Sequence, residues 1–121
     1  MSEKVVILGA SPEPERYSHK ALVMLKEHKH VPILVSPKYE KIEGHKVYKD
    51  LSEIKEKVDT LTVYVNPKIS SQLESKIIAL KPKRVIFNPG SENHELAKKL
   101  EKNEITTEEA CTLVLLTTNQ F

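Results

Sequence analysis

Four short runs of apolar, largely β-branched residues recur along the chain, and a polar turn follows each of them. The runs span residues 4–8, 31–35, 61–65 and 84–87. Runs so short and so continuous are typical of strands buried on both faces of a parallel sheet. Neighbouring parallel strands require crossover connections, so helices must lie between the runs. This feature alone predicts a fold in which strands and helices alternate.

The segments between these runs have the apolar spacing of helices. Ser18 is placed to cap the first helix, and Asn66 followed by Pro67 has the composition of another helix start. The apolar stripes expected on these two helices are Ala21, Leu22 and Leu25, and Ile69, Leu73, Ile77 and Leu80. Further helices are predicted at 50–57, at 92–102 and from 106 through 116, with a weak last strand at 104–106 and at most a short extended piece at 47–48.

Together these elements predict a single three-layer α/β domain over residues 1–121. Its sheet is expected to be parallel and doubly wound, Rossmann-like, with about five strands and the first of them in the centre. A chain of 121 residues is long enough for one such core and too short for a separate catalytic domain, which would have to come from another chain.

The composition narrows the classes of partner. The formal net charge is +2, tryptophan is absent and aromatic residues make up 5% of the chain, so we expect neither nucleic acid nor a membrane as partner. Cys111 is the only cysteine, which argues against an intrachain disulfide or a cysteine-cluster metal site and predicts a reducing, cytoplasmic environment. The start of the chain lacks the apolar run of a secretory signal. Only two of the 19 cations are arginine and two of the 17 acids are aspartate, a bias that favours a thermophilic source.

The ligand of a doubly wound sheet binds at the carboxyl ends of the strands, so the loops that follow the strands form the candidate site. The first loop begins with Gly9 but has one glycine where a dinucleotide fingerprint has three. Ser11, Arg16 and Ser18 offer two hydroxyls and a guanidinium beside a helix start, which predicts an anion site. The alternative is a plain connector, in which Ser18 only caps the helix and Arg16 pairs with a glutamate of the same loop.

The second loop bears on the kind of nucleotide. An NAD site needs an acid near the end of the second strand to bind the ribose hydroxyls, but the chain has Ser36, Pro37 and Lys38 there and no acid before Glu40. A cation without an acid favours a ribose that bears a phosphate, as in coenzyme A or NADP, over NAD. The alternative is that Lys38 is one more lysine on a solvated loop.

The third and fourth loops share an Asn-Pro step directly after a buried strand, at Asn66-Pro67 and Asn88-Pro89. Such a step fixes a turn and presents a helix start, which is a sufficient structural reason for both. Gly90 adds room for a ligand to approach the backbone. A wall of the binding cleft and a purely structural turn are therefore equal interpretations of these loops.

In these loops the chain resembles the small stand-alone CoA-binding proteins, whose domain is similar to the CoA-binding domain of the succinyl-CoA ligase alpha subunit. The residues that show the resemblance are Gly9-Ala10-Ser11, Arg16-Tyr17-Ser18, Val35-Ser36-Pro37, Gly44 with Tyr48 and Leu51, Val58-Asp59, Val63-Tyr64-Val65 with Pro67, Pro89-Gly90 leading into Glu92-Asn93, and Cys111. They follow in order over nearly the whole chain.

The resemblance implies a cleft for CoA. Its expected lining is Gly9, Ser11, Arg16, Ser36, Pro37, Lys38, Val65, Pro67 and Gly90, to which the anion loop adds Ser18. Two departures stand out, because Ser36 replaces the asparagine of most relatives and Asn88 the glutamine of many. The ligase's phosphorylated histidine lies in a domain that this chain does not contain, so the resemblance implies no reaction.

No side chain is assigned a catalytic or metal-binding role. Among the histidines only His94, expected in the first turn of a helix at the cleft, is worth testing as a proton carrier, and a solvated position explains it as well. Cys111 is expected to be structural and unreactive, with a helix start at 107–110 just before it.

The sequence therefore predicts a domain that binds coenzyme A or an acyl-CoA and has no catalytic activity of its own. It would act as a carrier, a sensor or a partner subunit, and formation of a homo-oligomer stays open. One alternative is a redox enzyme or sensor that uses NADP or NAD in the same cleft. The other is a lysine-rich interaction module with an empty cleft.

Overall fold

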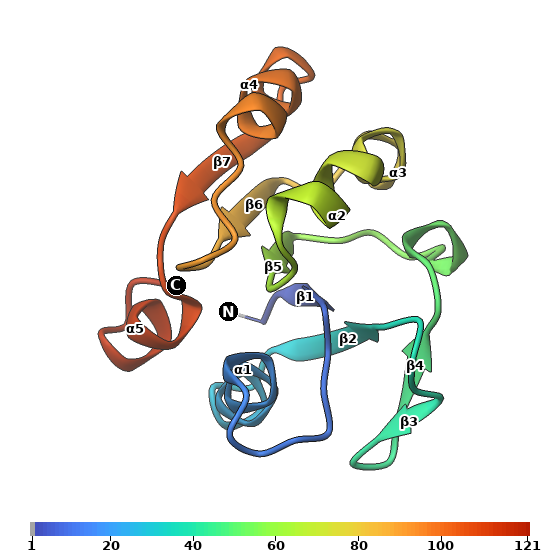
Figure 1. Cartoon of the computed structure of the whole chain (residues 1–121). Coiled ribbons are helices and arrows are strands. Elements are labelled where there is room, and N and C mark those ends of the chain that lie inside the picture. The colour runs from blue at the N-terminus through green and yellow to red at the C-terminus, as the bar shows by residue number, and fades with distance from the viewer. Residues whose placement is uncertain (1) are drawn as a thin grey trace.

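The computed structural model describes residues 2–121 and alternates strands with helices along almost the whole chain (Figure 1). The elements are β1 (Lys4–Leu8), α1 (Tyr17–Glu27), β2 (Val31–Val35), β3 (Lys41–Ile42), β4 (His45–Tyr48), the 3₁₀ turn η1 (Leu51–Glu53), β5 (Thr60–Val63), α2 (Pro67–Gln72), α3 (Glu74–Leu80), β6 (Arg84–Phe87), α4 (His94–Lys102), β7 (Thr106–Glu109) and α5 (Thr112–Thr117). None of the helices among the described residues is both long and apolar enough to cross a bilayer.

All strands belong to one sheet in the order β3-β4-β2-β1-β5-β6-β7. Every neighbouring pair is parallel except β3 and β4, which form an antiparallel hairpin at one edge. The sheet is wound outward from β1 in both directions, which confirms the doubly wound fold and the central position of the first strand. The expected five strands, which include the weak last strand, become seven, because the edge hairpin adds β3 and β4.

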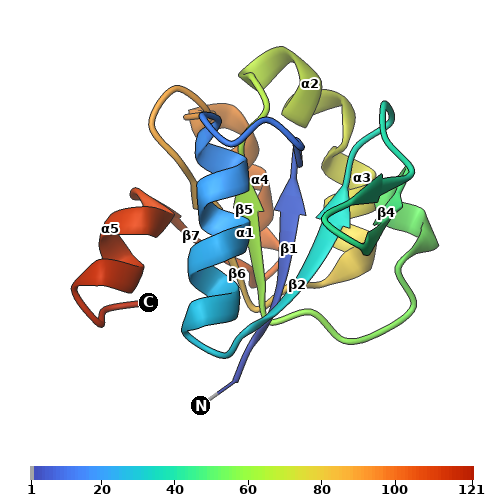
Figure 2. The ribbon, with the colours of Figure 1, turned by 90° about the horizontal axis from the view of Figure 1, so that it is seen from below.

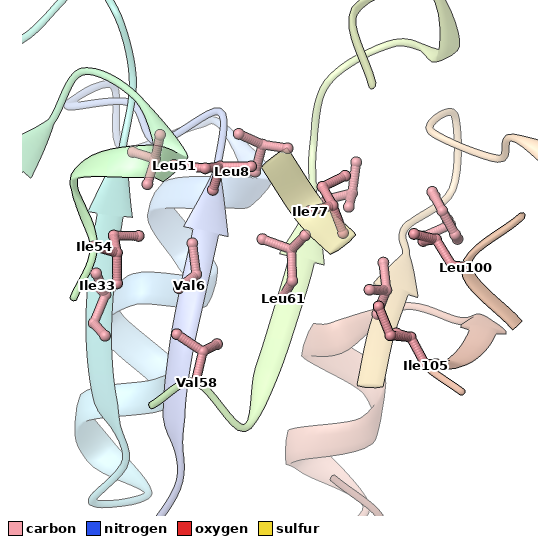
Figure 3. Packing of buried hydrophobic residues seen from close by; sticks show 14 of the residues in the cluster. Val6, Leu8, Ile33, Leu51, Ile54, Val58, Leu61, Ile77, Leu100 and Ile105 are labelled. Carbon is pink, nitrogen blue, oxygen red and sulfur yellow. The ribbon is translucent and has the colours of Figure 1, made fainter. Parts of the chain in front are cut away.

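Helices cover both faces of the sheet and so complete the three layers (Figure 1). Alternate residues of β1 point to opposite faces, as strand geometry requires. Val6 and Leu8 pack with Ile77 of α3 and Leu100 of α4, in the cluster that Figure 3 shows. Val5, Ile7 and their neighbours pack instead against Leu22 and Leu25 of α1 and Leu116 of α5. Figure 2 looks onto this second face, with α1 lying across the sheet and α5 beside it.

The β3–β4 hairpin lies where the sequence predicted at most a short extended piece at 47–48. Each of its strands buries one side chain, Ile42 at 1% exposure and Val47 at 4%, in the core beneath α1. The rest of the hairpin faces solvent, so the apolar pattern is too sparse to be recognised in the sequence. Gly44, with φ +80, takes part in the expected turn.

The predicted helix start at 106–109 is wrong, because these residues form β7 and pair in parallel with β6. The spacing of threonine and glutamate suits a capping box, but pairing with the free edge of β6 satisfies the backbone of the segment instead. The predicted strand at 104–106 begins two residues later, and the last helix begins only at Thr112.

The predicted helix after Asn66 is divided into α2 and α3 at Leu73. Its four apolar residues therefore do not share one buried face, since Ile77 is fully buried whereas Ile69 is 43% exposed. The predicted helix at 50–57 shortens to the turn η1. Asp50 caps this turn by accepting from the Ser52 amide, and the Glu53 carboxylate accepts a hydrogen bond from the Lys49 amide.

Candidate functional site

A cavity of about 500 Å³ opens where the carboxyl ends of β1, β5 and β6 meet the start of α1. Three loops contribute its lining, which consists of Gly9, Ser11, Glu15, Arg16, Tyr17, Ser18, Tyr64, Val65, Asn66, Pro89, Gly90 and Ser91. The chain leaves β1 for α1 on one face of the sheet and leaves β5 for α2 on the other. This is the switch point at which doubly wound sheets bind their ligands.

The loop after β1 is held close to the neighbouring strands by Gly9. The amides of Gly9 and Ala10 both donate to the Val35 carbonyl, at 3.0 and 3.1 Å, which ties the loop to the end of β2. Gly9 has φ +94, and a Cβ at this position would lie 3.1 Å from Cγ1 of Val65. Glycine is therefore required here both by the backbone conformation and by the close approach to Val65.

The start of α1 presents unused donors to the cavity. The helix begins at Tyr17, and the amides of His19 and Lys20 both donate to the Arg16 carbonyl. Among the described residues, the amides of Tyr17 and Ser18 have no hydrogen-bond acceptor. First-turn amides at a helix start attract anions, because they combine free N–H groups with the positive end of the helix dipole.

Ser18 does not cap this helix, contrary to the prediction. Arg16 occupies the N-cap position in an extended conformation, and no side chain accepts a hydrogen bond there. Ser18 follows as the second helical residue and is 5% exposed. The serine whose composition suits a cap thus lies two residues after the N-cap position.

The guanidinium of Arg16 lies at the rim of the cavity. Its Nε donates to the Glu13 carboxylate at 2.9 Å, and 68% of the Arg16 side chain is exposed. The Glu13 amide in turn donates to the Ser11 hydroxyl at 3.1 Å. The pairing of Arg16 with a loop glutamate is therefore present, but an exposed pair of this kind is weak enough to exchange for a ligand phosphate.

The opposite wall rests on a buried polar network around Asn88. The Asn88 side-chain amide donates to the Thr62 hydroxyl at 2.6 Å and to the Val63 carbonyl at 2.9 Å, and its oxygen accepts from the Thr112 amide at 2.9 Å. This network fixes the turn at Pro89 and Gly90. Of the two interpretations of this loop, a structural turn applies to Asn88. Pro89 and Gly90, by contrast, line the cavity.

Tyr64 connects this network to the cavity. Tyr64 is one of the residues that line the cavity, and its buried hydroxyl makes no hydrogen bond within the described structure. Burial raises the pKa of Tyr64 to about 12, against an opposing influence from the nearby Thr62 and Thr112 hydroxyls. The phenol is therefore neutral at physiological pH.

A second, smaller cavity of about 190 Å³ adjoins the first and shares Gly9 and Val65 with it. It is mostly apolar, and its remaining lining is Leu8, Val35, Pro37, Lys49, Asp50, Leu51, Ile69 and Leu73. The Asp50 carboxylate is already engaged, because it accepts from the Lys76 ammonium at 2.8 Å and from the Ser52 amide at 3.2 Å. The hydrogen bond from Lys76 is the main reason why the pKa of Asp50 is lowered.

The residues expected to bind a cofactor fall into three groups in the structure. Gly9, Ser11, Arg16, Ser18, Val65 and Gly90 line the larger cavity, and Pro37 lines the smaller one. Ser36, Lys38 and Pro67 line neither. Ser36 is buried, with its hydroxyl accepting from the Lys38 amide at 3.2 Å, while Lys38 and Pro67 are exposed.

Several lining residues were not anticipated as site residues. In the larger cavity these are Glu15, Tyr17, Tyr64, Asn66, Pro89 and Ser91, each next to or near a predicted site residue in the sequence. Lys49 and Asp50 reach the smaller cavity because the β3–β4 hairpin returns the chain to the sheet. No local pattern indicates that return.

The histidines and Cys111 lie outside the lining of both cavities. His94 is largely exposed and its Nε2 lies 2.6 Å from the Glu109 carboxylate. His19, by contrast, is buried between the Ser11 carbonyl and Glu43. Cys111 directly precedes α5 and is half-buried, so the expected helix start at 107–110 is absent. Within residues 2–121, no three potential metal ligands among His, Cys, Asp and Glu lie together.

Comparison with known proteins gives a family and a fold. Residues 3–117 match the family model of a CoA binding domain. An uncharacterized protein of known structure is 43% identical to this chain, with a TM-score of 0.95 over 100% of this chain and 99% of that one. A protein from Thermus thermophilus is 26% identical, with a TM-score of 0.89 over 98% of this chain and 90% of that one.

A larger enzyme contains the same fold as one part. The acetyl-coenzyme A synthetase 1 of Ca. Korarchaeum cryptofilum, in complex with phosphate and ADP, is 19% identical with a TM-score of 0.74. The match covers 89% of this chain but 25% of the synthetase. At that identity the likeness is one of fold alone.

Proposed function

The chain belongs to the CoA binding domain family, and from that premise we propose that it binds coenzyme A or an acyl-CoA in the two adjoining cavities at the carboxyl ends of the strands. The observation that supports this most is the start of α1, where two free amides, a serine hydroxyl and an exposed guanidinium surround one cavity. Such a set of donors suits a pyrophosphate.

The larger cavity would take the charged part of the ligand. The amides of Tyr17 and Ser18 donate to one phosphate, and the Ser11 hydroxyl is free to donate because it only accepts from the Glu13 amide. Arg16 exchanges its exposed partner Glu13 for the ligand. The ligand gains charge-assisted hydrogen bonds, and the protein loses only a solvent-screened ion pair.

The smaller cavity would take the adenine ring, because its lining is mostly apolar and it adjoins the anion site at Gly9 and Val65. Lys49 lies at this cavity, and its ammonium makes no ion pair within the described residues. We assign the ribose phosphate to Lys49, whereas the sequence pointed to Lys38. The only acid here, Asp50, is held by Lys76 and is not available for the ribose hydroxyls of NAD.

We infer that the chain serves as a carrier, a sensor or a partner subunit. The lining of the larger cavity includes neither histidine nor cysteine, and its one carboxylate, Glu15, is exposed to solvent. A solvated carboxylate is a weak general base at neutral pH.

Thermal unfolding in the presence of nucleotides tests the proposal. A ligand that binds only the folded state stabilises it by about 2.7 kcal/mol at a hundredfold excess over its Kd. We expect CoA to raise the melting temperature, and NAD at the same concentration to leave it unchanged. NADP serves as the third ligand, because equal or larger stabilisation by NADP or NAD would replace CoA with a redox cofactor.

A further inference from the structure

We propose that His19 is a positioning residue, which clamps the loop between β1 and α1 to the tip of the β3–β4 hairpin. Through this clamp the hairpin would hold the anion-binding loop in shape. The effect on CoA rests on the proposed function, whereas the clamp itself can be tested in the protein without ligand.

Both nitrogens of the His19 ring are engaged. Nδ1 lies 3.1 Å from the Ser11 carbonyl oxygen, and Nε2 lies 2.5 Å from the Glu43 carboxylate. A carbonyl oxygen only accepts, so Nδ1 donates to Ser11, and Nε2 faces the Glu43 carboxylate. The His19 side chain is 6% exposed, which shields both contacts from water on the histidine side. One buried ring thus joins two segments that are far apart in the sequence.

The backbone at Glu43 gives a second reason to regard this contact as functional. Glu43 has φ +50 and Gly44 has φ +80, so both residues of the hairpin turn are in the left-handed region. Turns of this type favour asparagine or glycine, because a larger side chain costs conformational energy there. A glutamate at this position is explained by its carboxylate, which the turn delivers to His19.

The clamp acts on the part of the loop that faces the cavity. Two hydrogen bonds to the Val35 carbonyl hold Gly9 and Ala10, and His19 holds the next residue by its carbonyl. The Ser11 carbonyl is thereby turned toward His19. Without the hydrogen bond from His19 this oxygen is free to turn toward the cavity, where its partial negative charge would oppose a phosphate. The clamp therefore keeps an acceptor out of a site built from donors.

A glutamate-to-glycine substitution separates the clamp from the turn. Glu43→Gly relieves the strained backbone but removes the carboxylate. The matched control is Glu104→Gly, because Glu104 is exposed, has φ +64 and lies between α4 and β7. We expect both variants to keep or raise the melting temperature, since glycine suits both backbones.

Hydrogen exchange and calorimetry then measure the clamp. In the ligand-free protein, we expect Glu43→Gly to speed amide exchange in residues 10–18 and Glu104→Gly to leave it as in the wild type. We expect the Kd for CoA to rise about tenfold in Glu43→Gly, the loss of one charged hydrogen bond. Glu43→Gln should restore most of the protection, since its side-chain amide can still form a hydrogen bond with Nε2 of His19.

Two results would overturn the proposal. Exchange in residues 10–18 that is the same in Glu43→Gly as in the wild type would show that the hairpin does not hold the loop. Faster exchange with unchanged CoA affinity would show that the clamp does not position the site. If the wild type does not bind CoA, the proposed function fails, and the exchange rates still decide whether the clamp exists.

Discussion

Arg16 is the residue whose side chain distinguishes a binding loop from a plain connector. Arg16→Ala should weaken CoA binding by about 1.5 to 3 kcal/mol, the contribution of a charged hydrogen bond to a phosphate. The free energy of unfolding should change by less than about 1 kcal/mol, because the lost pair with Glu13 is exposed. Calorimetric titration and chemical denaturation measure the two effects.

The control for Arg16 is Lys20→Ala on the same helix, since Lys20 is exposed and lies outside the cavity lining. It removes the same charge from the same region of the surface. An affinity for CoA that falls equally in both variants would reduce Arg16 to a contributor of general positive charge.

The buried phenol of Tyr64 makes stability depend on alkaline pH. Its folded pKa of about 12 lies above the unfolded value of about 10, so the neutral ring favours the folded state below pH 10 and that advantage is lost as the pH rises through 12. Between pH 8 and pH 11, the wild type should lose about 1 kcal/mol of unfolding free energy that Tyr64→Phe retains.

Tyr64→Phe should not destabilise the protein at pH 8, because the hydroxyl makes no hydrogen bond to any of the residues that the structure describes. Denaturant titrations at the two pH values provide the measurement. Tyr17→Phe is the control, since 56% of Tyr17 is already exposed in the folded protein. A clear loss of stability for Tyr64→Phe at pH 8 would mean that the hydroxyl has a partner.

The sequence predicted residues of the cavity lining where the chemistry is local. Gly9, Ser11 and Arg16 follow directly from the strand, the loop and the helix start. Lys49 and Asp50 could not be predicted, because they reach the smaller cavity through a hairpin with only one buried residue on each strand. The buried His19 was equally hidden, since its partners Ser11 and Glu43 lie in separate loops.

At the scale of the elements, the turn from β1 into the following loop requires glycine at position 9. Gly9→Ala should destabilise the fold by about 2 to 4 kcal/mol, since it combines a strained left-handed backbone with a Cβ that meets Val65. Gly90→Ala is the matched control, because its φ of +91 is similar to +94 at Gly9 and, beyond its chain neighbours, no atom of residues 2–121 lies within 4 Å of its added Cβ. Denaturation midpoints compare the two.

We expect the free energy of unfolding of Gly9→Ala to be lower than that of Gly90→Ala by about 1 kcal/mol or more. This difference is the cost of forcing an extra carbon into a packed contact. Equal losses would indicate that backbone strain alone explains Gly9. The loop and Val65 would then have room that the structure does not show.

The strands with continuous apolar runs were predicted correctly. The bounds of edge strands, which form only because a neighbouring strand pairs with them, were not. β1, β2 and β6 match their predicted residues, because a strand buried on both faces needs an unbroken apolar run. β7 has the sequence Thr-Thr-Glu-Glu and no apolar residue, so only the free edge of β6 makes it a strand. Edge strands depend on a partner that the local sequence does not reveal.

At the scale of the whole molecule, the doubly wound topology determines where a ligand can bind. The alternation of strands and helices predicted that topology, including the central first strand. The loops after β1, β5 and β6 consequently meet at one end of the sheet and share one cavity. The loop after β2 contributes fewer lining residues than the sequence suggested, because only Pro37 of that loop lines a cavity. The strand β4 of the hairpin pairs with the end of β2, and Lys49, which follows β4, lines the smaller cavity where Lys38 does not.

The most direct test of the central claim is a titration of the ¹⁵N-labelled protein with CoA, followed by the amide signals of the backbone. We expect saturable shifts, at one CoA per chain, for residues around the larger cavity such as Ser11, Tyr17, Ser18 and Gly90. With NAD at the same concentration we expect no shifts. Shifts that gather instead at the opposite end of the sheet, around His30 and Lys83, would contradict the account, as would the absence of any saturable shift.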